Sequence, residues 1–400
     1  MKRLELFQRL SRSSPSRIVL VVIDGIGGLP VKGKTELETA FTPNLDKLAE
    51  EGICGMLDPV LPGVTPGSGP GHLALFGYDP LEFEVGRGVL SALGVGFPLQ
   101  PGDIAARINF ATVDEEGKVV DRRAGRISTS LNRKLCEKLQ ERIKIPGVDI
   151  FVKTEKEHRA VVIFRGKNLS DKISDTDPQK TGVPPKEPLP LEEEAKDTSR
   201  IVKEFLRQTR EILGSLKPAN FILMRGFASL PHIPTLQEIY KLHPACIAVY
   251  PMYKGIAKLV GMRVLETGES MEEEVLTLEE NFESFDFFFL HFKQTDSSGE
   301  DGDFERKVRI IEEIDSLIPR IRKLNPEVLV VTGDHSTPSS LKSHSWHTVP
   351  VALVSPYARV DEVREFKERT CIKGGLGRME AVNLMGLMMA HALKLEKFGA

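Results

Sequence analysis

The sequence predicts an α/β protein, with a core of largely parallel sheet flanked by helices and a smaller inserted α+β domain. Near-continuous apolar runs rich in β-branched and aromatic residues indicate strands that are buried on both faces, as parallel strands are. Helical patterns lie between these runs, and this alternation is typical of α/β folds. The five runs occupy residues 17–24, 220–225, 245–250, 285–292 and 327–334.

Helices are predicted from capping residues and from apolar periodicity. The segment 42–52 has Thr42 in an N-cap position, Pro43 in the first turn and Gly52 where the helix should end. The segment 303–324 carries apolar side chains at helical spacing. We therefore expect one helix in each segment, between strands of the sheet.

The stretch from about residue 100 to 190 has a different pattern. Residues 105–123 predict a hairpin whose turn is DEEGK, a helix is expected over 130–144, and VDIFVK and HRAVVIFRG predict two more short strands. Five prolines between 178 and 190 indicate a stiff connector. We therefore predict a core domain formed by 1–99 and 190–400, and an inserted α+β domain formed by 100–189.

Composition excludes several classes of partner. Hydrophobic residues make up 40% of the 400 residues, charged residues 28%, and the net charge is −3, which argues against a nucleic-acid or membrane-surface partner. The longest apolar run is too short to span a bilayer, and the basic N-terminus has no signal-peptide pattern. Scattered cysteines predict reduced thiols in a cytoplasmic protein; they are Cys54, Cys136, Cys246 and Cys371.

The loop TPGSGPGH, residues 65–72, surrounds Ser68 with glycine and proline. Such a run cannot form the interior of a helix or strand, whereas the following HLALFGYD predicts a short helix. Ser68 is therefore expected at or near a helix N-terminus, where free N–H groups and the positive end of the helix dipole favour an incoming anion. A nucleophilic serine is one interpretation of this loop and an ordinary turn serine is the other.

Acidic residues and histidines follow the predicted strands. Asp24 ends the first, Asp296 lies just past another, and the adjacent pair Asp334 and His335 ends a third, while His344 precedes the apolar run at 349–354. Ligands of open α/β sheets bind beyond the carboxyl ends of the strands, so these side chains should converge. Carboxylates and imidazoles gathered in this way suit Mn²⁺ or Zn²⁺.

A serine nucleophile beside divalent cations predicts phosphoryl or sulfuryl transfer. Two cations can activate the hydroxyl and neutralise the oxygens of a transferred phosphate, and the serine then divides the transfer into two steps. Several motifs, taken together and in this order, are specific for one protein family. They are IDGIGG, TPNLDKLAEEG, TPGSGPGHLALFGYDP, RGVLSALGVG, KQTDSSGEDGDF, TGDHSTP and HSWHTVPV. Over nearly its whole length the chain resembles the archaeal-type 2,3-bisphosphoglycerate-independent (cofactor-independent) phosphoglycerate mutases of the alkaline phosphatase superfamily.

The resemblance implies two metal sites. Asp24, Ser68, Asp334 and His335 match the ligands of one metal, and Ser68 also matches the residue that becomes phosphorylated. Asp296 and His344 match ligands of the other metal. At the position where the family has a third ligand, a histidine, this sequence has Glu300, which we expect to bind metal in its place. The additional His347 has no counterpart in the family, and we expect a structural or surface role for it.

The segment DRRAGR supplies the expected substrate contacts. Arg122, Arg123 and Arg126 suit a substrate that carries both a carboxylate and a phosphate, although a solvated charge run is the alternative. By resemblance, Lys254 and Arg378 are further anion-binding residues. The resemblance also suggests that Asp121 is the acid/base that handles the proton of the substrate hydroxyl.

The function implied is interconversion of 3-phosphoglycerate and 2-phosphoglycerate through phosphorylated Ser68, with two divalent cations and no 2,3-bisphosphoglycerate. Mn²⁺ is the expected metal, because an oxygen-rich site with Glu300 favours Mn²⁺ or Mg²⁺ over Zn²⁺. Zn²⁺, Co²⁺ and Mg²⁺ are the alternatives. The alternatives are a phosphatase or phosphodiesterase, a phosphotransferase resembling homoserine kinases, and a non-catalytic relative. The sequence does not fix the oligomeric state and leaves a homo-oligomer open.

Overall fold

The computed structural model describes residues 2–399, which form two compact units. The first unit contains the chain up to Glu84, then Ile233–Tyr250, and then the chain from Ile256 onward. The second contains Val85–His232 and Pro251–Gly255. The second unit differs in its bounds from the predicted 100–189, since it begins earlier, ends later and also includes Pro251–Gly255.

The first unit is built on a mixed sheet that is mostly parallel, as the apolar runs predicted. Its strand order is β13-β2-β12-β11-β1-β10-β8-β9, in which only β12 runs antiparallel to its neighbours. Every residue of β1, β10 and β11 is buried, which explains their uninterrupted apolar sequences. The strands are β1 Ile18–Ile23, β2 Ile53–Asp58, β8 Pro244–Ile247, β9 Arg263–Val264, β10 Phe287–Phe292, β11 Val328–Thr332, β12 Val349–Val354 and β13 Gly377–Glu380.

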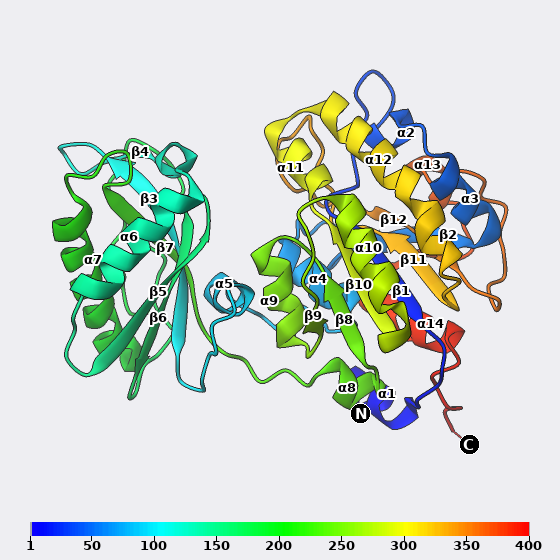
Figure 1. The fold of residues 1–400 in the computed structure, drawn as a ribbon, viewed down its shortest axis with the longest axis horizontal. Coiled ribbons are helices and arrows are strands. Elements are labelled where there is room, and N and C mark those ends of the chain that lie inside the picture. The colour runs from blue at the N-terminus through cyan, green and yellow to red at the C-terminus, as the bar shows by residue number, and fades with distance from the viewer. Residues whose placement is uncertain (1, 400) are drawn as a thin grey trace. The chain divides into compact units, whose positions relative to one another are not determined.

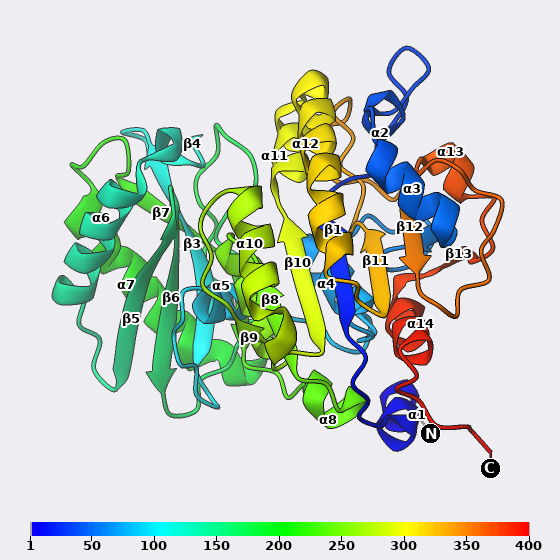
Figure 2. The ribbon, with the colours of Figure 1, turned by 45° about the vertical axis from the view of Figure 1, so that its right-hand side comes forward.

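Helices cover this sheet. On one face α10, α12 and α3 lie side by side (Figures 1 and 2). Both predicted helices are confirmed: α3 begins after Thr42 and ends before Gly52, and α12 presents its apolar stripe to the core. The α-helices are α1 Arg3–Leu10, α2 Glu36–Thr39, α3 Pro43–Glu51, α4 Ser68–Leu75, α8 Leu236–Tyr240, α9 Pro251–Leu259, α10 Met271–Asn281, α11 Gln294–Asp301, α12 Phe304–Lys323, α13 Glu368–Cys371 and α14 Leu384–His391.

The carboxyl ends of three parallel strands meet at one edge of the sheet. Strand β1 lies between β10 and β11, with Ile23 opposite Phe292 and Val22 opposite Thr332. The residues that follow these strands therefore emerge next to one another although they are far apart in the sequence. This register brings the acidic and histidine residues of three motifs to one place.

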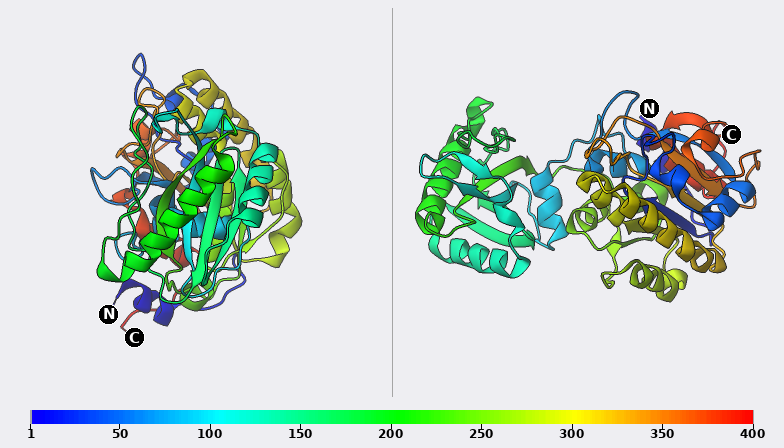
Figure 3. Two further views of the ribbon diagram at one scale, coloured as in Figure 1. Left: turned by 90° about the vertical axis from the view of Figure 1, so that its left-hand side faces the viewer. Right: turned by 90° about the horizontal axis from the view of Figure 1, so that it is seen from above.

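The second unit is a five-stranded antiparallel sheet with helices on both faces. Helices α6 and α7 pack on one face, as Figure 3 shows, and α5 packs on the other. The predicted hairpin, the helix near 130–144 and the two following strands are all present. The elements are α5 Arg87–Gly94, β3 Ile104–Val113, β4 Val119–Asp121, α6 Thr129–Arg142, β5 Val148–Lys156, β6 Arg159–Gly166, α7 Lys196–Leu213 and β7 Phe221–Ser229.

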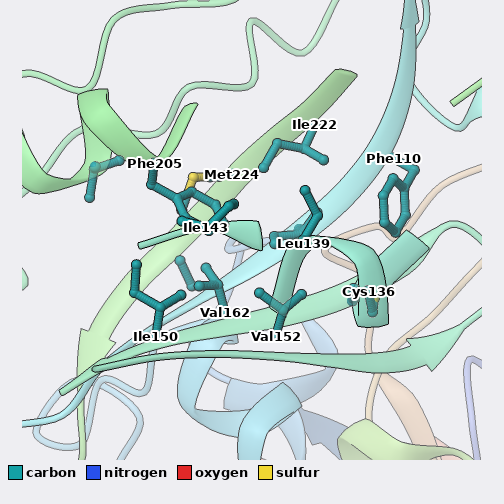
Figure 4. Close-up of a cluster of buried hydrophobic side chains, with 14 of the residues drawn as sticks. Phe110, Cys136, Leu139, Ile143, Ile150, Val152, Val162, Phe205, Ile222 and Met224 are labelled. Atoms are coloured by element: carbon teal, nitrogen blue, oxygen red, sulfur yellow. The ribbon is translucent and has the colours of Figure 1, made fainter. Parts of the chain in front are cut away.

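The run at 220–225 was assigned to the wrong sheet. It forms β7, which pairs antiparallel with β3 in the second unit and leaves the parallel sheet of the first unit without it. The proline-rich segment does not end the second unit either, because Thr176 N–H donates to the Met224 carbonyl at 2.9 Å and holds that segment against β7. Helix α7 then closes over the core, to which Phe205, Ile222 and Met224 all belong (Figure 4).

Within residues 2–399, no helix combines the length and the apolar character needed to cross a bilayer. All four cysteines are buried and none of them forms a disulfide in this part of the chain. The prediction of reduced thiols is therefore consistent with the structure.

Candidate active site

Two groups of side chains in the first unit have the composition and spacing of metal sites. One consists of Asp24, Asp334 and His335, and the other of Asp296, His335 and His344. Within each group, one ligand atom from every member lies within 4.8 Å of the others. His335 belongs to both groups. The structure thus brings together the strand-end residues that the sequence had singled out, with the exception of Glu300.

The imidazole of His335 is the centre of the first group. Its Nε2 lies 3.3 Å from Asp24 Oδ1, 3.2 Å from Asp334 Oδ2 and 3.3 Å from Ser68 Oγ. Burial lowers the pKa of His335 despite the adjacent carboxylates of Asp334 and Asp24, so the ring is neutral and its lone pair can bind metal. Ser68 stands at the first position of α4, as predicted from its loop.

The second group surrounds Asp296, the third residue of α11. Asp296 Oδ1 lies 3.5 Å from His344 Nε2 and 4.0 Å from His335 Nε2, and it accepts a hydrogen bond from Thr337 Oγ1 at 2.6 Å. The rings of His335 and His344 stack with their centroids 3.7 Å apart. His344 Nδ1 is held by the Pro66 carbonyl at 2.9 Å, which turns Nε2 toward Asp296.

The donor atoms fit divalent cations. Asp334 Oδ2 is buried and accepts no hydrogen bond from the described residues, although the ring nitrogens of His72 and His335 each lie 3.2 Å away. Such a buried acceptor is costly unless a cation or a polar ligand contacts it. Mixed carboxylate and imidazole donors suit Mn²⁺, Zn²⁺ and related ions. The chemistry of the groups therefore supports the predicted metal sites without distinguishing between these metals.

Three residues that sequence reasoning missed support the carboxylates. His291 Nε2 lies 3.2 Å from Asp24 Oδ2, and Lys293 is ion-paired with both Asp24 and Asp296. His72 Nδ1 donates to the Ser68 carbonyl at 2.7 Å and lies 3.2 Å from Asp334. His291 was hidden inside an apolar strand. A signal was available, because a histidine among fully buried strand residues needs a polar partner.

The buried carboxylates are ionised in this arrangement. Burial alone would raise the pKa of Asp24, but the Lys293 ammonium and the hydrogen bond with His291 hold that pKa well below its usual range. The same balance applies to Asp296, whose pKa burial would raise and Lys293 lowers. The site thus presents negative charge to its surroundings before any metal binds.

Glycine allows the nucleophile loop to approach the metal ligands. A Cβ atom on Gly71 would lie 2.4 Å from the Asp334 carbonyl oxygen, so no larger residue fits where α4 meets the end of β11. A Cβ on Gly67 would meet nothing closer than 3.7 Å. At Gly71 the close approach is to the protein backbone beside a metal ligand.

Two residues near the groups lie outside them. Glu300 is in the last turn of α11 with its side chain exposed, one turn beyond Asp296, and the structure therefore gives no support to the prediction that it is a ligand. His347 donates to or accepts from Ser345 Oγ at 2.9 Å and stacks on Trp346, which suits the structural role expected of it.

The second unit gathers arginines on the face of its sheet that carries α5. Arg107 on β3 is opposite Arg225 on β7, and Arg159 on β6 is opposite Asn109 on β3, so strand alternation directs these side chains to one face. The face was not predicted, because the arginines come from three separate strands. Near it, Ser91 of α5 donates to the buried carboxylate of Glu155 at 3.0 Å.

The pKa of His158 is lowered by burial and by the positive charge at this face. Burial and the cations of Arg159, Arg123, Arg107 and Arg126 lower the pKa of His158 to about 3. Two of these arginines, Arg123 and Arg126, belong to the predicted DRRAGR segment. The segment and the strand arginines therefore form one basic cluster in the second unit.

Two other residues of DRRAGR are engaged within the unit. Asp121 accepts hydrogen bonds from the N–H groups of Arg123 and Gly125 at 2.8 and 2.6 Å, and so fixes a turn in which Ala124, Gly125 and Arg126 all have positive φ. Its geometry is that of a residue that positions the turn, which leaves the predicted acid/base role without support. Arg122 is held by Asp177 through two hydrogen bonds of 2.9 and 2.6 Å.

The remaining predicted anion ligands lie elsewhere. Lys254 is on α9, within the short stretch of that helix that belongs to the second unit. Arg378 on β13 forms two 2.8 Å hydrogen bonds to Asp58 and lines a surface depression together with Met379 and Glu380. Its guanidinium is therefore already neutralised by a carboxylate.

Replacing Gly71 by alanine should displace α4 from the metal groups. We expect Gly71→Ala to lower the free energy of unfolding by about 1–3 kcal/mol, a usual cost of overpacking, and to weaken Mn²⁺ binding. The matched variant Gly67→Ala should cost about 1 kcal/mol or less, since its Cβ has space and its φ is −85°. Urea unfolding and calorimetric titration measure both effects, and equal behaviour of the two variants would contradict this packing argument.

The low pKa of His158 predicts a pH dependence of stability. The unfolded chain binds a proton at His158 near its ordinary pKa of about 6.5, whereas the folded protein does so only near pH 3, so stability should decline as the pH falls between these values. His158→Gln should reduce the loss between pH 7 and pH 5 by about 1 kcal/mol, allowing for solvent screening. Urea unfolding at both pH values checks this, and parallel curves for the two proteins would refute it.

Comparison with known proteins agrees with this geometry. A family model for 2,3-bisphosphoglycerate-independent phosphoglycerate mutase matches residues 49–220. The chain is 53% identical to a probable 2,3-bisphosphoglycerate-independent phosphoglycerate mutase from Thermus thermophilus, over 98% of both chains. It is 51% identical to one from Thermotoga maritima, over 99% of both chains.

Two solved structures extend the similarity to the fold. A protein from Pyrococcus horikoshii is 30% identical with a TM-score of 0.84, over 97% of this chain and 100% of that one. A cofactor-independent phosphoglycerate mutase from Thermoplasma acidophilum is 31% identical with a TM-score of 0.70, over 94% of this chain and 100% of that one. The chain belongs to the family of 2,3-bisphosphoglycerate-independent phosphoglycerate mutases.

Proposed function

We propose that the protein interconverts 3-phosphoglycerate and 2-phosphoglycerate through a phosphoserine at Ser68. Membership of the family supports the reaction. The observation that carries the assignment of the nucleophile is the position of Ser68 Oγ, 3.3 Å from the ring nitrogen that is common to both metal groups. A serine at the start of a helix and beside two sets of metal ligands is placed to attack a phosphorus atom.

The reaction takes two balanced steps. Ser68 Oγ loses its proton and forms a bond to phosphorus, while the bond from phosphorus to the 3-oxygen of the substrate breaks and that oxygen gains a proton. The 2-hydroxyl of the glycerate then loses its proton and attacks the phosphorus, the bond from phosphorus to Ser68 Oγ breaks, and Ser68 Oγ regains a proton. Each phosphate transfer is matched by one proton lost and one gained, so no 2,3-bisphosphoglycerate is needed to prime the enzyme.

Two divalent cations, Mn²⁺ by our proposal, would be held by the two groups. Asp24, Asp334, His335 and Ser68 would bind one, and Asp296 and His344 the other. Bound there, such cations supply the charge that neutralises phosphoryl oxygens and favours ionisation of the serine hydroxyl. The residues themselves orient these ligands: His344 through the Pro66 carbonyl and Asp296 through Thr337. Glu300 is exposed and lies outside both groups.

The second unit is proposed to recognise the substrate. Phosphoglycerate carries a carboxylate and a phosphate, and guanidinium groups bind both through paired hydrogen bonds. Arg107, Arg123, Arg126 and Arg159 form a basic cluster around a neutral His158, which is consistent with an anion site. Arg123 is exposed, so it can meet an incoming substrate. Arg122, by contrast, is occupied by Asp177 and serves to hold the segment in place.

We further propose a cytoplasmic location. The support is the set of four buried thiols, since an oxidising compartment would favour disulfides. A small-molecule substrate is the expected partner, in keeping with a net charge of −3 that offers little to nucleic acid or to anionic membranes.

Ser68→Ala tests the proposed function most simply. The variant should lose isomerisation by several orders of magnitude while keeping its fold, because it removes the nucleophile and little packing. The assay couples 2-phosphoglycerate formation to enolase, with Mn²⁺ and without 2,3-bisphosphoglycerate, and quenched wild-type protein should carry phosphate on the peptide that contains Ser68. Activity above about 1% of wild type would exclude the covalent route.

Arg123→Ala should separate recognition from chemistry. We expect kcat/KM for phosphoglycerate to fall about 10-fold to 100-fold, while hydrolysis of a small phosphate ester falls far less, because that ester lacks the second anionic group. Arg200→Ala is the matched control, since Arg200 is an exposed arginine of the same unit that pairs with Asp197 on the surface. Equal losses on both substrates would mean that the cluster serves folding.

A further inference from the structure

Lys293 bridges the two metal groups. It follows strand β10 and immediately precedes α11, whose third residue is Asp296. Its ammonium lies 3.2 Å from Asp24 Oδ2 and donates a hydrogen bond to Asp296 Oδ2. One carboxylate of each proposed metal site therefore contacts the same side-chain cation.

The two carboxylates divide their oxygens in the same way. Asp24 Oδ1 faces His335, and Asp296 Oδ1 faces His335 and His344, at 3.3, 4.0 and 3.5 Å respectively. Both Oδ2 atoms face Lys293 instead, and that of Asp24 also lies 3.2 Å from His291 Nε2. One oxygen of each aspartate is thus presented to the imidazole ligands, and the other is held by an ammonium group.

The burial of the carboxylates makes this contact energetically important. The side chains of Asp24 and Asp296 are 0% and 1% exposed, while that of Lys293 is 22% exposed. Like charges that share a buried site cannot both stay ionised without a counter-charge. In the metal-bound protein the cations provide it. In the metal-free protein a resident cation must do so.

We propose that Lys293 is a built-in counter-ion, a positioning residue that stands in for the divalent cations while the sites hold none. It holds Asp24 and Asp296 together in the metal-free protein, and it competes with the metal for their charge. This role rests on the proposed two-cation site. It makes Lys293 important to the metal-free state and much less so to the metal-bound state.

The consequence is a reciprocal effect on stability and affinity. If Lys293→Met destabilises the metal-free protein more than the metal-bound protein, linkage requires the variant to bind metal more tightly. A residue needed to shape the bound site would show the opposite. We therefore expect Lys293→Met to bind Mn²⁺ about fivefold or more tightly in calorimetric titration, and to show a larger Mn²⁺-induced rise in Tm than wild type.

Two variants control this measurement. Lys293→Arg keeps the charge and should resemble wild type in Mn²⁺ affinity. Lys47→Met changes the net charge by the same amount at a surface pair with Glu50 and should leave Mn²⁺ affinity unchanged. Unchanged or weaker Mn²⁺ binding by Lys293→Met would overturn the proposal.

A double-mutant cycle in EDTA tests the same contact without metal. Asp24→Asn removes one of the carboxylates that Lys293 neutralises, so Lys293→Met should lower the Tm less in that background than in wild type. Additive Tm shifts would overturn the proposal even if Lys293→Met were poorly folded without metal. If wild type bound no Mn²⁺, the two-cation site would fail, whereas the cycle would still decide the role of Lys293.

Discussion

The burial of carboxylates at one edge of a parallel sheet is the constraint on which this structure depends. Asp24, Asp296 and Asp334 are almost completely inaccessible to solvent and lie around one imidazole, that of His335. Bringing these charges together is unfavourable unless positive charge meets them. Lys293 and the neighbouring histidines meet part of that need within the chain, and divalent cations would meet the rest. The site therefore attracts cations.

The rest of the first unit serves to keep that edge in register. Fully apolar strands β1, β10 and β11 fix where the acidic residues emerge, and covering helices on one face hold the sheet. The absence of a side chain at Gly71 lets α4 carry Ser68 up to the same place. The nucleophile and the metal ligands therefore come from five separate segments whose convergence depends on ordinary strand pairing and close packing.

Residues that belong to a recognisable local motif could be predicted from the sequence, whereas residues defined only by their contacts in the folded chain could not. Strand-end motifs are local, so Asp24, Ser68, Asp296, Asp334, His335 and His344 could be identified from the sequence. For His72 and Lys293 no signal stood out, and His291 was recognisable only as a histidine within a fully buried strand. Strand β7 looked like its parallel counterparts because buried strands of either kind are apolar; only pairing with β3 distinguishes it. Asp121 was assigned by resemblance and Glu300 as the replacement of a family histidine; Asp121 holds a turn, while Glu300 is exposed and belongs to neither metal group.

The central claim is that this edge of the sheet holds two separate cation sites, one around Asp24 and one around Asp296. Calorimetric titration of the metal-free protein with Mn²⁺ tests it most directly, when wild type is compared with Asp24→Asn and Asp296→Asn. The account predicts two Mn²⁺ per wild-type chain and one per chain in each variant, because each aspartate belongs to only one of the groups. A stoichiometry of one in wild type, or of two in both variants, would contradict it.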